Sequence, residues 1–198
     1  MAETVAGVVL AGGGSRRMGT DKALLDVGGR PLLAHVAARL APQVGALALN
    51  ANGNPARFAD FDLPVIADGG YAGPLAGILT AMRWAAQANA DHVVSLPVDT
   101  PFVPADLAAR LLAALGTAEI AIARSRGRTH PTVGLWRTSL GGDLDTWLAG
   151  TDDLAVRAFL AGRQVAMADF PDDAGGDPFF NVNTPEDAAI ASARLAGR

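Results

Sequence analysis

Residues 10–22 combine glycines with basic side chains in a pattern that favours phosphate binding. Three consecutive glycines, Gly12 to Gly14, let backbone N–H groups approach an anion closely and point toward it together. Arg16, Arg17 and Lys22 add positive charge to the same loop. A flexible surface turn is the plainer alternative. The added charges, and the position of the loop after a buried strand, favour a phosphate site.

Two well-known phosphate loops do not match these residues. A P-loop ends in Gly-Lys-Ser/Thr, whereas Gly19 is followed by Thr20 and Asp21. The dinucleotide fingerprint Gly-x-Gly-x-x-Gly, begun at Gly12, needs a glycine where Arg17 stands. Both families are therefore excluded.

Asp99 is a carboxylate placed where it could hold a metal ion. It follows the apolar run 92–96, which Pro97 begins to terminate because proline cannot donate to a strand ladder. This position predicts that Asp99 lies at the carboxyl edge of a parallel sheet, near the glycine loop. One such carboxylate can anchor Mg²⁺, because this ion takes few carboxylates together with phosphate oxygens. A plain turn residue is the alternative on these residues alone.

Lys22 is the only lysine among 16 basic residues, and all the others are arginines. It stands in the loop that the glycine pattern marks. A compact ammonium fits confined spaces that a wide planar guanidinium does not. We therefore expect the Lys22 ammonium to reach a phosphate oxygen.

Other polar residues carry weaker signals. His130 is expected to be a structural hydrogen-bonding residue. Arg124, Arg126 and Arg128 line one turn and are expected to be solvated, with contact to a substrate phosphate as the alternative.

The composition excludes several classes of protein. The chain has 198 residues, half of them hydrophobic and 18% charged, which is enough to bury a core and argues against disorder. The net charge of −4 argues against a protein that coats nucleic acid, and the lack of cysteine excludes disulfides and thiolate metal sites. No export signal or membrane span is predicted, so we expect a cytoplasmic protein.

Apolar runs alternate with segments of helical periodicity along the chain. The runs predict strands at residues 5–10, 44–49, 63–67, 92–96, 118–123, 132–136 and 165–170. Helices are predicted at residues 31–40, 74–86, 104–115, around 144 and 159, and 185–194, the last capped by Thr184. This order predicts one α/β domain over residues 1–198, with a mostly parallel sheet.

Residues 10–33 resemble the signature of nucleotidyltransferases that activate a phosphate with a nucleoside triphosphate. The shared core is LAGGxSxRMG, a nearby lysine and then GRPL. Members that act on sugar phosphates or use CTP commonly place proline before the lysine, whereas Asp21-Lys22 resembles the molybdenum cofactor guanylyltransferase branch. Further blocks match that branch in order: NAN at 50–52, GPLAG at 73–77, PVDTP at 97–101, HPT at 130–132 and NVNTP at 181–185.

The resemblance implies a Rossmann-like three-layer α/β/α nucleotidyltransferase fold. It implies transfer of GMP from GTP to the phosphate of molybdopterin, with Mg²⁺ as cofactor and pyrophosphate as the other product. The N-terminal part would mainly bind GTP and the C-terminal part mainly the acceptor. Candidate protein partners are molybdoenzymes, their chaperones and other cofactor-biosynthesis proteins; nucleic acid and membranes are not expected.

The resemblance also assigns roles to single residues. The catalytic residues would be Lys22, Arg17 and Asp99. The nucleotide-binding residues would be Leu10, Ala11, Gly12, Gly13, Lys22, Asn50, Asp68 and Asp99. Asp99 would hold the metal, with Asn183 completing its shell. Acceptor binding falls to Asn181, Asn183 and Arg157. We expect Asn181 and Asn183 to alternate along a short strand, so that two buried amides share one face.

One departure from the family pattern concerns the acceptor. Members often carry a basic pair after the glycine that corresponds to Gly150, whereas this chain has Thr151-Asp152-Asp153. Arg157 is expected to compensate. The alternatives that remain open are a cytidylyltransferase acting on the same pterin, a nucleotidyltransferase for another small phosphate, and a non-catalytic nucleotide-binding or cofactor-delivery module.

Overall fold

A computed structural model describes residues 3–12, 21–172 and 175–197. Its central sheet has seven strands in the order β5-β4-β1-β6-β8-β7-β9. Their bounds are β1 Val5–Leu10, β4 Ala46–Asn50, β5 Val65–Ile66, β6 His92–Pro97, β7 Ile120–Ser125, β8 Arg128–Arg137 and β9 Val165–Asp169. Only β8 runs antiparallel to its neighbours among these strands, so the predicted mostly parallel sheet is confirmed.

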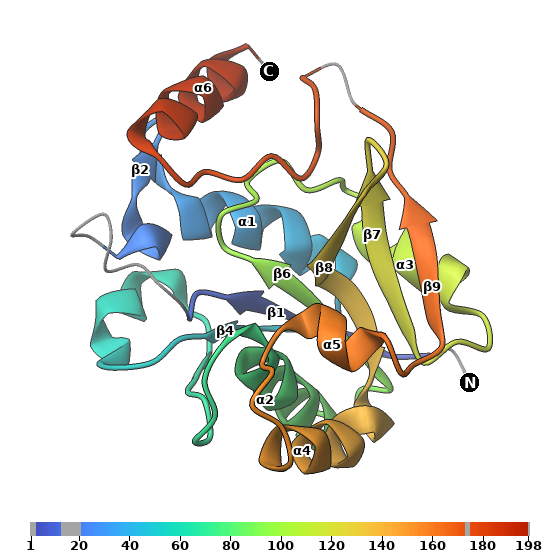
Figure 1. The fold of residues 1–198 in the computed structure, drawn as a ribbon. Coiled ribbons are helices and arrows are strands. Elements are labelled where there is room, and N and C mark those ends of the chain that lie inside the picture. Colours follow the sequence, from blue (N-terminus) through green and yellow to red (C-terminus); the bar gives the residue numbers. More distant parts are fainter. Residues whose placement is uncertain (1–2, 13–20, 173–174, 198) are drawn as a thin grey trace.

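Helices cover both faces of this sheet (Figure 1). On one face lie α1 (Leu32–Leu40) and α3 (Leu107–Leu115); on the other lie α2 (Pro74–Gln87), α4 (Gly141–Ala149) and α5 (Val156–Leu160). Along β1, Val9 packs into the first apolar core and Val8 into the second, because successive strand side chains point to opposite faces. The fold is therefore the three-layer α/β/α arrangement that the resemblance implied.

A small third cluster lies outside these layers. A two-stranded hairpin, β2 (Asp26–Val27) and β3 (Arg30–Pro31), packs against α6 (Pro185–Ala196) through Val27 and Ala191. Gly28 and Gly29 turn the hairpin with φ values of 64° and 82°, which glycine adopts without a Cβ clash. The hairpin was not predicted, because two-residue strands leave no periodic pattern.

Helix α6 begins as predicted, whereas the segment before it does not form the predicted strand. The Thr184 hydroxyl accepts from Asp187 N, and the Asp187 carboxylate accepts from the backbone N–H groups of Asn183 and Thr184. Residues 181–183 lie outside every strand of the described chain: Val182 is buried and donates one backbone bond to Asp99 O. Asn181 and Asn183 are exposed, so the expectation of two buried amides was wrong.

Several other bounds differ from the predictions; the strand predicted at 132–136, for example, extends over Arg128–Arg137. The strand predicted at 63–67 shrinks to Val65–Ile66 at the sheet edge, and the helix predicted from 104 begins at Leu107. Within the described ranges, no helix is long and apolar enough to cross a membrane.

Candidate active site

The carboxyl ends of β1, β4 and β6 meet at one edge of the sheet and bring the predicted nucleotide-site residues together. Ala11 N donates to Asn50 O at 2.9 Å, and Val98 N donates to Leu10 O at 3.0 Å. These bonds join the first residues of three loops into one rim, as expected where parallel strands end side by side.

Lys22 lies between two oxygens supplied by distant parts of the chain. Its Nζ is 2.7 Å from Asp99 Oδ2 and 2.6 Å from Asn183 Oδ1. The side chains of Lys22 and Asp99 are only 17% and 19% exposed. The structure therefore brings three of the predicted site residues into direct contact, from η2 (Lys22–Leu24), the loop after β6 and the segment before α6.

Asp99 has one oxygen that the described protein leaves without a partner. Asp99 Oδ1 is buried and accepts no hydrogen bond from any described residue. Such an atom is costly unless something satisfies it. No group of three or more His, Cys, Asp or Glu side chains gathers in the described ranges, so a metal ion here would need oxygens from a ligand. The donor set, one carboxylate and one amide oxygen, fits Mg²⁺ held partly by phosphates.

Asn183 is positioned by the start of α6. Its backbone N–H donates to the Asp187 carboxylate at 2.9 Å. This bond is the main reason that the pKa of Asp187 lies below its ordinary value, so the carboxylate stays charged at neutral pH. The capping interaction thus fixes the backbone from which the Asn183 amide reaches Lys22.

Two asparagines and an aspartate form a second cluster at the end of β4. The Asn50 amide donates to Asp68 Oδ1 at 2.8 Å, and the Asn52 amide donates to Asp68 Oδ2 at 2.8 Å. Asp68 N in turn donates to Asn52 Oδ1. The predicted residues Asn50 and Asp68 are therefore in contact, and Asn52 joins them although the sequence analysis gave it no role.

Gly77 makes room for this cluster, whereas Gly12 lies at ordinary contact distance from it. A Cβ at Gly12 would lie 3.5 Å from both Asn50 Oδ1 and Asp68 Oδ2. A Cβ at Gly77, in α2, would lie only 2.5 Å from Asn50 Oδ1. The Asn50 amide can thus keep its position only because position 77 lacks a side chain.

Arg57 is a site residue that the sequence analysis missed. Its Nε donates to Asp21 Oδ2 at 2.7 Å, and its Nη2 donates to Asn52 O at 2.7 Å. Asp21 Oδ1 also accepts from Ala23 N and caps η2, the helix that begins with Lys22. One guanidinium therefore connects the Lys22 turn to the loop of the Asn50 cluster. No local pattern marks a pair 36 residues apart.

The strap (residues 175–183), which leads to Asn183, is anchored to the β7–β8 hairpin. Ser125 Oγ donates to Asp177 Oδ1 at 2.9 Å and lies 2.8 Å from His130 Nε2. The His130 ring packs on Phe179 with centroids 4.8 Å apart. Burial lowers the pKa of His130 below its ordinary value, against a smaller opposite effect of Asp177, so the ring is neutral at pH 7. His130 is a structural residue, as expected.

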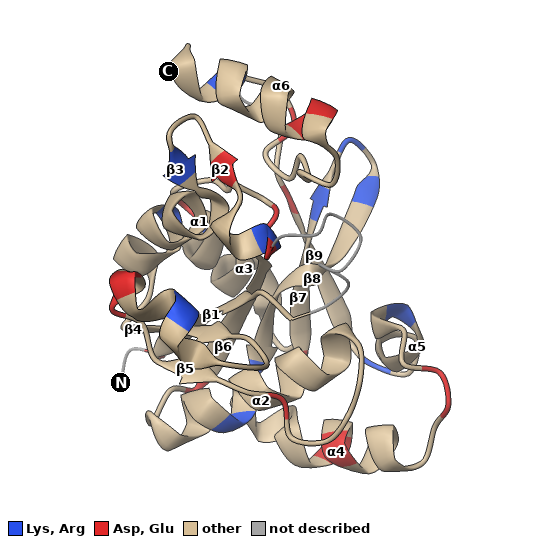
Figure 2. Cartoon of the chain, turned by 90° about the vertical axis from the view of Figure 1, so that its left-hand side faces the viewer, with Lys and Arg blue, Asp and Glu red and all other residues tan. Residues whose placement is uncertain are grey.

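The basic residues of the hairpin do not form a free cationic tip. Figure 2 shows basic residues grouped along the β7–β8 hairpin. Arg124 pairs with Asp169 through two bonds of 2.6 Å, and Arg126 pairs with Asp172. The expectation that this whole turn is solvated holds only in part.

Arg157 lies apart from the Lys22 cluster. It lines a hollow of about 280 Å³ between α5 and the sheet, with Pro131, Leu160 and Met167 among its walls. Asp153, in the segment that departs from the family pattern, accepts from Ala155 N just before α5. None of the described contacts joins Arg157 to Lys22, Asp99 or Asn183.

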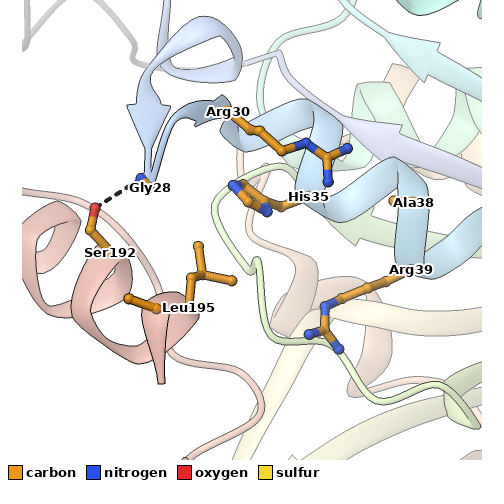
Figure 3. A pocket seen from close by; sticks show the side chains of 8 residues that line it. Gly28, Arg30, His35, Ala38, Arg39, Ser192 and Leu195 are labelled. Atoms are coloured by element: carbon orange, nitrogen blue, oxygen red, sulfur yellow. Dashed lines mark hydrogen bonds between the residues drawn. The ribbon is translucent and has the colours of Figure 1, made fainter. Parts of the chain in front are cut away.

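A larger hollow of about 420 Å³ lies between the β2–β3 hairpin, α1 and α6 (Figure 3). Arg30, His35 and Arg39 face Ser192 and Leu195 across it. His35 Nε2 bonds Val27 O, and Ser192 Oγ accepts from Gly28 N, so these polar groups hold the hairpin in place. The hollow shares no lining residue with the Lys22 cluster.

Two predicted site residues, Gly13 and Arg17, lie outside the described residues.

Comparison with known proteins agrees with this geometry. Residues 7–167 match the model of the MobA-like NTP transferase domain. A protein of Cereibacter sphaeroides named molybdenum cofactor guanylyltransferase is 52% identical over 190 residues, which cover 96% of each chain. A protein of the same name from Rhodopseudomonas palustris is 51% identical and covers 93% of this chain and 89% of its own.

A solved structure resembles the fold over the whole length. Molybdopterin-guanine dinucleotide biosynthesis protein A from Archaeoglobus fulgidus has a TM-score of 0.79 at 21% identity, covering 98% of this chain and all of its own. Sequence and fold therefore agree: this chain belongs to the MobA-like NTP transferase family, and it is a nucleotidyltransferase of the group named molybdenum cofactor guanylyltransferase.

Proposed function

We propose that this protein transfers GMP from GTP to the phosphate of molybdopterin and releases pyrophosphate. The names of relatives that are about half identical over nearly the whole chain support this activity. The observation that carries it is the contact of Lys22 with Asp99 and Asn183 at the carboxyl edge of the sheet. A cation and a carboxylate meet there beside the rim formed by β1 and β4.

The chemistry needs positive charge more than it needs a base. The attacking phosphate oxygen of the acceptor is already ionised at neutral pH, and it displaces pyrophosphate from the α-phosphorus of GTP. Two polyanions must come together, and negative charge develops on the leaving group. Lys22 supplies a positive charge in a partly buried site, where such a charge acts more strongly than in water. Arg17 is proposed to add a second positive charge.

Asp99 and Asn183 are proposed to hold Mg²⁺. When bound, the ion would neutralise phosphate charge and help to orient the reacting groups. Asp99 offers a carboxylate whose side chain is partly buried, and Asn183 contributes a neutral oxygen from a capped helix start. The two backbones are joined, because Val182 N donates to Asp99 O at 2.9 Å.

The rest of the nucleotide is proposed to lie along the ends of β1 and β4. Leu10, Ala11, Gly12 and Gly13 would line the nucleotide. Ala11 N already donates to Asn50 O, so the backbone N–H groups of Gly12 and Gly13 are the ones proposed to face the triphosphate. Asn50 and Asp68 would bind the base or ribose, because their side chains are fixed by hydrogen bonds and lie against Gly12. A preformed polar pair of this kind discriminates between ligands at little entropic cost.

The acceptor is proposed to bind on the C-terminal side of the chain, to Asn181, Asn183 and Arg157. Both asparagines are exposed on the strap, so they are accessible to a second substrate. We further propose that residues 1–198 act as one domain in the cytoplasm, where GTP is available. The dinucleotide product would pass to molybdoenzymes or their chaperones.

Pyrophosphate release with each of the four nucleoside triphosphates, with and without molybdopterin, tests this function. We expect release with GTP that depends on molybdopterin, and little release with ATP, CTP or UTP. A wrong base would leave buried polar groups unpaired, at roughly 1–3 kcal/mol per group. Equal turnover with CTP would favour a cytidylyltransferase, and binding of GTP without any release would favour a non-catalytic module.

A further inference from the structure

The Lys22 ammonium already occupies the position of a bound cation. Its Nζ lies 2.7 Å from Asp99 Oδ2 and 2.6 Å from Asn183 Oδ1. These residues are the two that are proposed to hold the divalent metal. An ammonium of the chain itself therefore lies on two of the oxygens proposed for the metal, Asp99 Oδ2 and Asn183 Oδ1.

The accessible side of Asp99 is the side that Lys22 covers. Of the two carboxylate oxygens, Oδ1 is buried, whereas Oδ2 accepts from the ammonium. A metal ion that enters from solvent meets Oδ2 and the exposed Asn183 amide first. Mg²⁺ binds oxygen at about 2.0–2.1 Å, so it cannot share both of these oxygens with an ammonium at hydrogen-bond distance.

We propose that Lys22 is an internal stand-in for the divalent cation and that a metal–triphosphate displaces it. This inference rests on the proposed function, in which Asp99 and Asn183 hold the metal. Without nucleotide, the ammonium neutralises Asp99 and opposes metal binding. When the triphosphate arrives, its oxygens offer the ammonium a new partner and the metal takes the vacated oxygens. Binding of metal and of nucleotide is therefore cooperative.

The surroundings of Lys22 allow the side chain to move while its backbone stays fixed. Asp21 caps η2 and is itself held by Arg57, so the turn that carries Lys22 is anchored on one side. The four-carbon stem of lysine is flexible, and its three ammonium donors do not require one fixed geometry. Exchange of partners thus needs rotation about side-chain bonds only. This also gives a reason for a lysine in a chain whose other basic residues are arginines.

Binding of Mn²⁺ to the nucleotide-free protein, measured by electron paramagnetic resonance of free Mn²⁺, tests the proposal. Lys22→Met removes the competing charge and adds no oxygen ligand, so we expect Mn²⁺ to bind about tenfold more tightly than to the wild type, or better. Arg83→Gln removes one positive charge from an exposed ion pair with Asp145 and serves as the control for net charge, with unchanged affinity expected. In the double variant Lys22→Met with Asp99→Asn, the gain in Mn²⁺ affinity should be lost.

The outcomes separate this proposal from the proposed function. Equal Mn²⁺ affinity of the wild type and Lys22→Met would overturn the stand-in role and leave the metal site intact. Weaker binding by Lys22→Met, with an unchanged melting temperature, would overturn it too, because Lys22 would then organise the site. Absence of Mn²⁺ binding in every variant, even with the α,β-methylene analogue of GTP, would overturn both.

A second measurement uses the same variants. Adding that analogue should raise the Mn²⁺ affinity of the wild type more than the affinity of Lys22→Met, because only the wild type has an ammonium to displace. An equal rise in both proteins would contradict the displacement.

Discussion

The proposed nucleotide side and the proposed acceptor side of this protein are built differently. At the ends of β1 and β4, Asn50, Asn52 and Asp68 bind one another through short hydrogen bonds, and Arg57 ties them to the Lys22 turn. On the acceptor side, Asn181 is exposed on the strap and Arg157 lines a separate hollow. If these proposals hold, the nucleotide site is fixed before binding and the acceptor site is more open.

The largest effect is expected where the two sides meet, at Asp99. Asp99→Asn is nearly isosteric but removes the negative charge that Lys22 contacts and that the proposed metal would use. We expect turnover to fall on the order of a hundredfold or more, with an unchanged fold. Steady-state kinetics at saturating Mg²⁺, with circular dichroism as the folding control, checks this. Near-normal kcat would show that Asp99 does not hold the metal.

A methyl group at position 77 tests whether the nucleotide side is preformed. Gly77→Ala would place a Cβ 2.5 Å from Asn50 Oδ1 and force the Asn50 amide to move. We expect the KM for GTP to rise by about tenfold, equivalent to ~1.4 kcal/mol. Gly142→Ala is the matched control, because a Cβ there meets nothing within 4 Å. An unchanged KM in Gly77→Ala would show that the nucleotide does not use the Asn50 amide.

Arg57→Gln tests whether the link between the Lys22 turn and the Asn50 cluster matters for the proposed nucleotide site. It removes the bonds to Asp21 and to Asn52 O but does not touch the proposed substrates. We expect kcat/KM for GTP to fall about fivefold, a modest loss because the ion pair is partly exposed. Arg110→Gln is the control, since Arg110 also pairs with an aspartate and stacks on a phenylalanine. An equal fall in kcat/KM in both variants would show that the effect reflects a general loss of stability and not a role of Arg57 at the site.

The smallest effect is expected on the open side. Arg157→Gln should raise the KM for molybdopterin by about threefold and leave the KM for GTP unchanged, as an exposed cation contributes little to binding. Titration of each substrate with the other held at saturation separates the two constants. A rise in the KM for GTP would place Arg157 on the nucleotide side.

Much of the fold could be predicted from the chain because strands and helices alternate in long apolar segments. The same reasoning places Asp99 beside the glycine loop, since parallel strands end at one edge. The separate roles of Lys22 and Asn183 came from family resemblance instead, and their direct contact was not predicted, because 161 residues separate them. The Arg57–Asp21 pair and the β2–β3 hairpin depend on tertiary contacts that no periodic pattern records. The expectation of buried amides at Asn181 and Asn183 was wrong because this segment does not pair as a strand. Val182 makes one backbone hydrogen bond, to Asp99 O, in place of a strand ladder.

Transfer of radioactive phosphate from GTP labelled at the α-position to molybdopterin tests the central claim most directly. The wild type should form a labelled guanine dinucleotide and unlabelled pyrophosphate, and the same assay with Asp99→Asn should give on the order of one-hundredth of the rate. Unlabelled pterin after prolonged incubation, or equal labelling by Asp99→Asn, would contradict the assignment of this edge of the sheet as the site of guanylyl transfer.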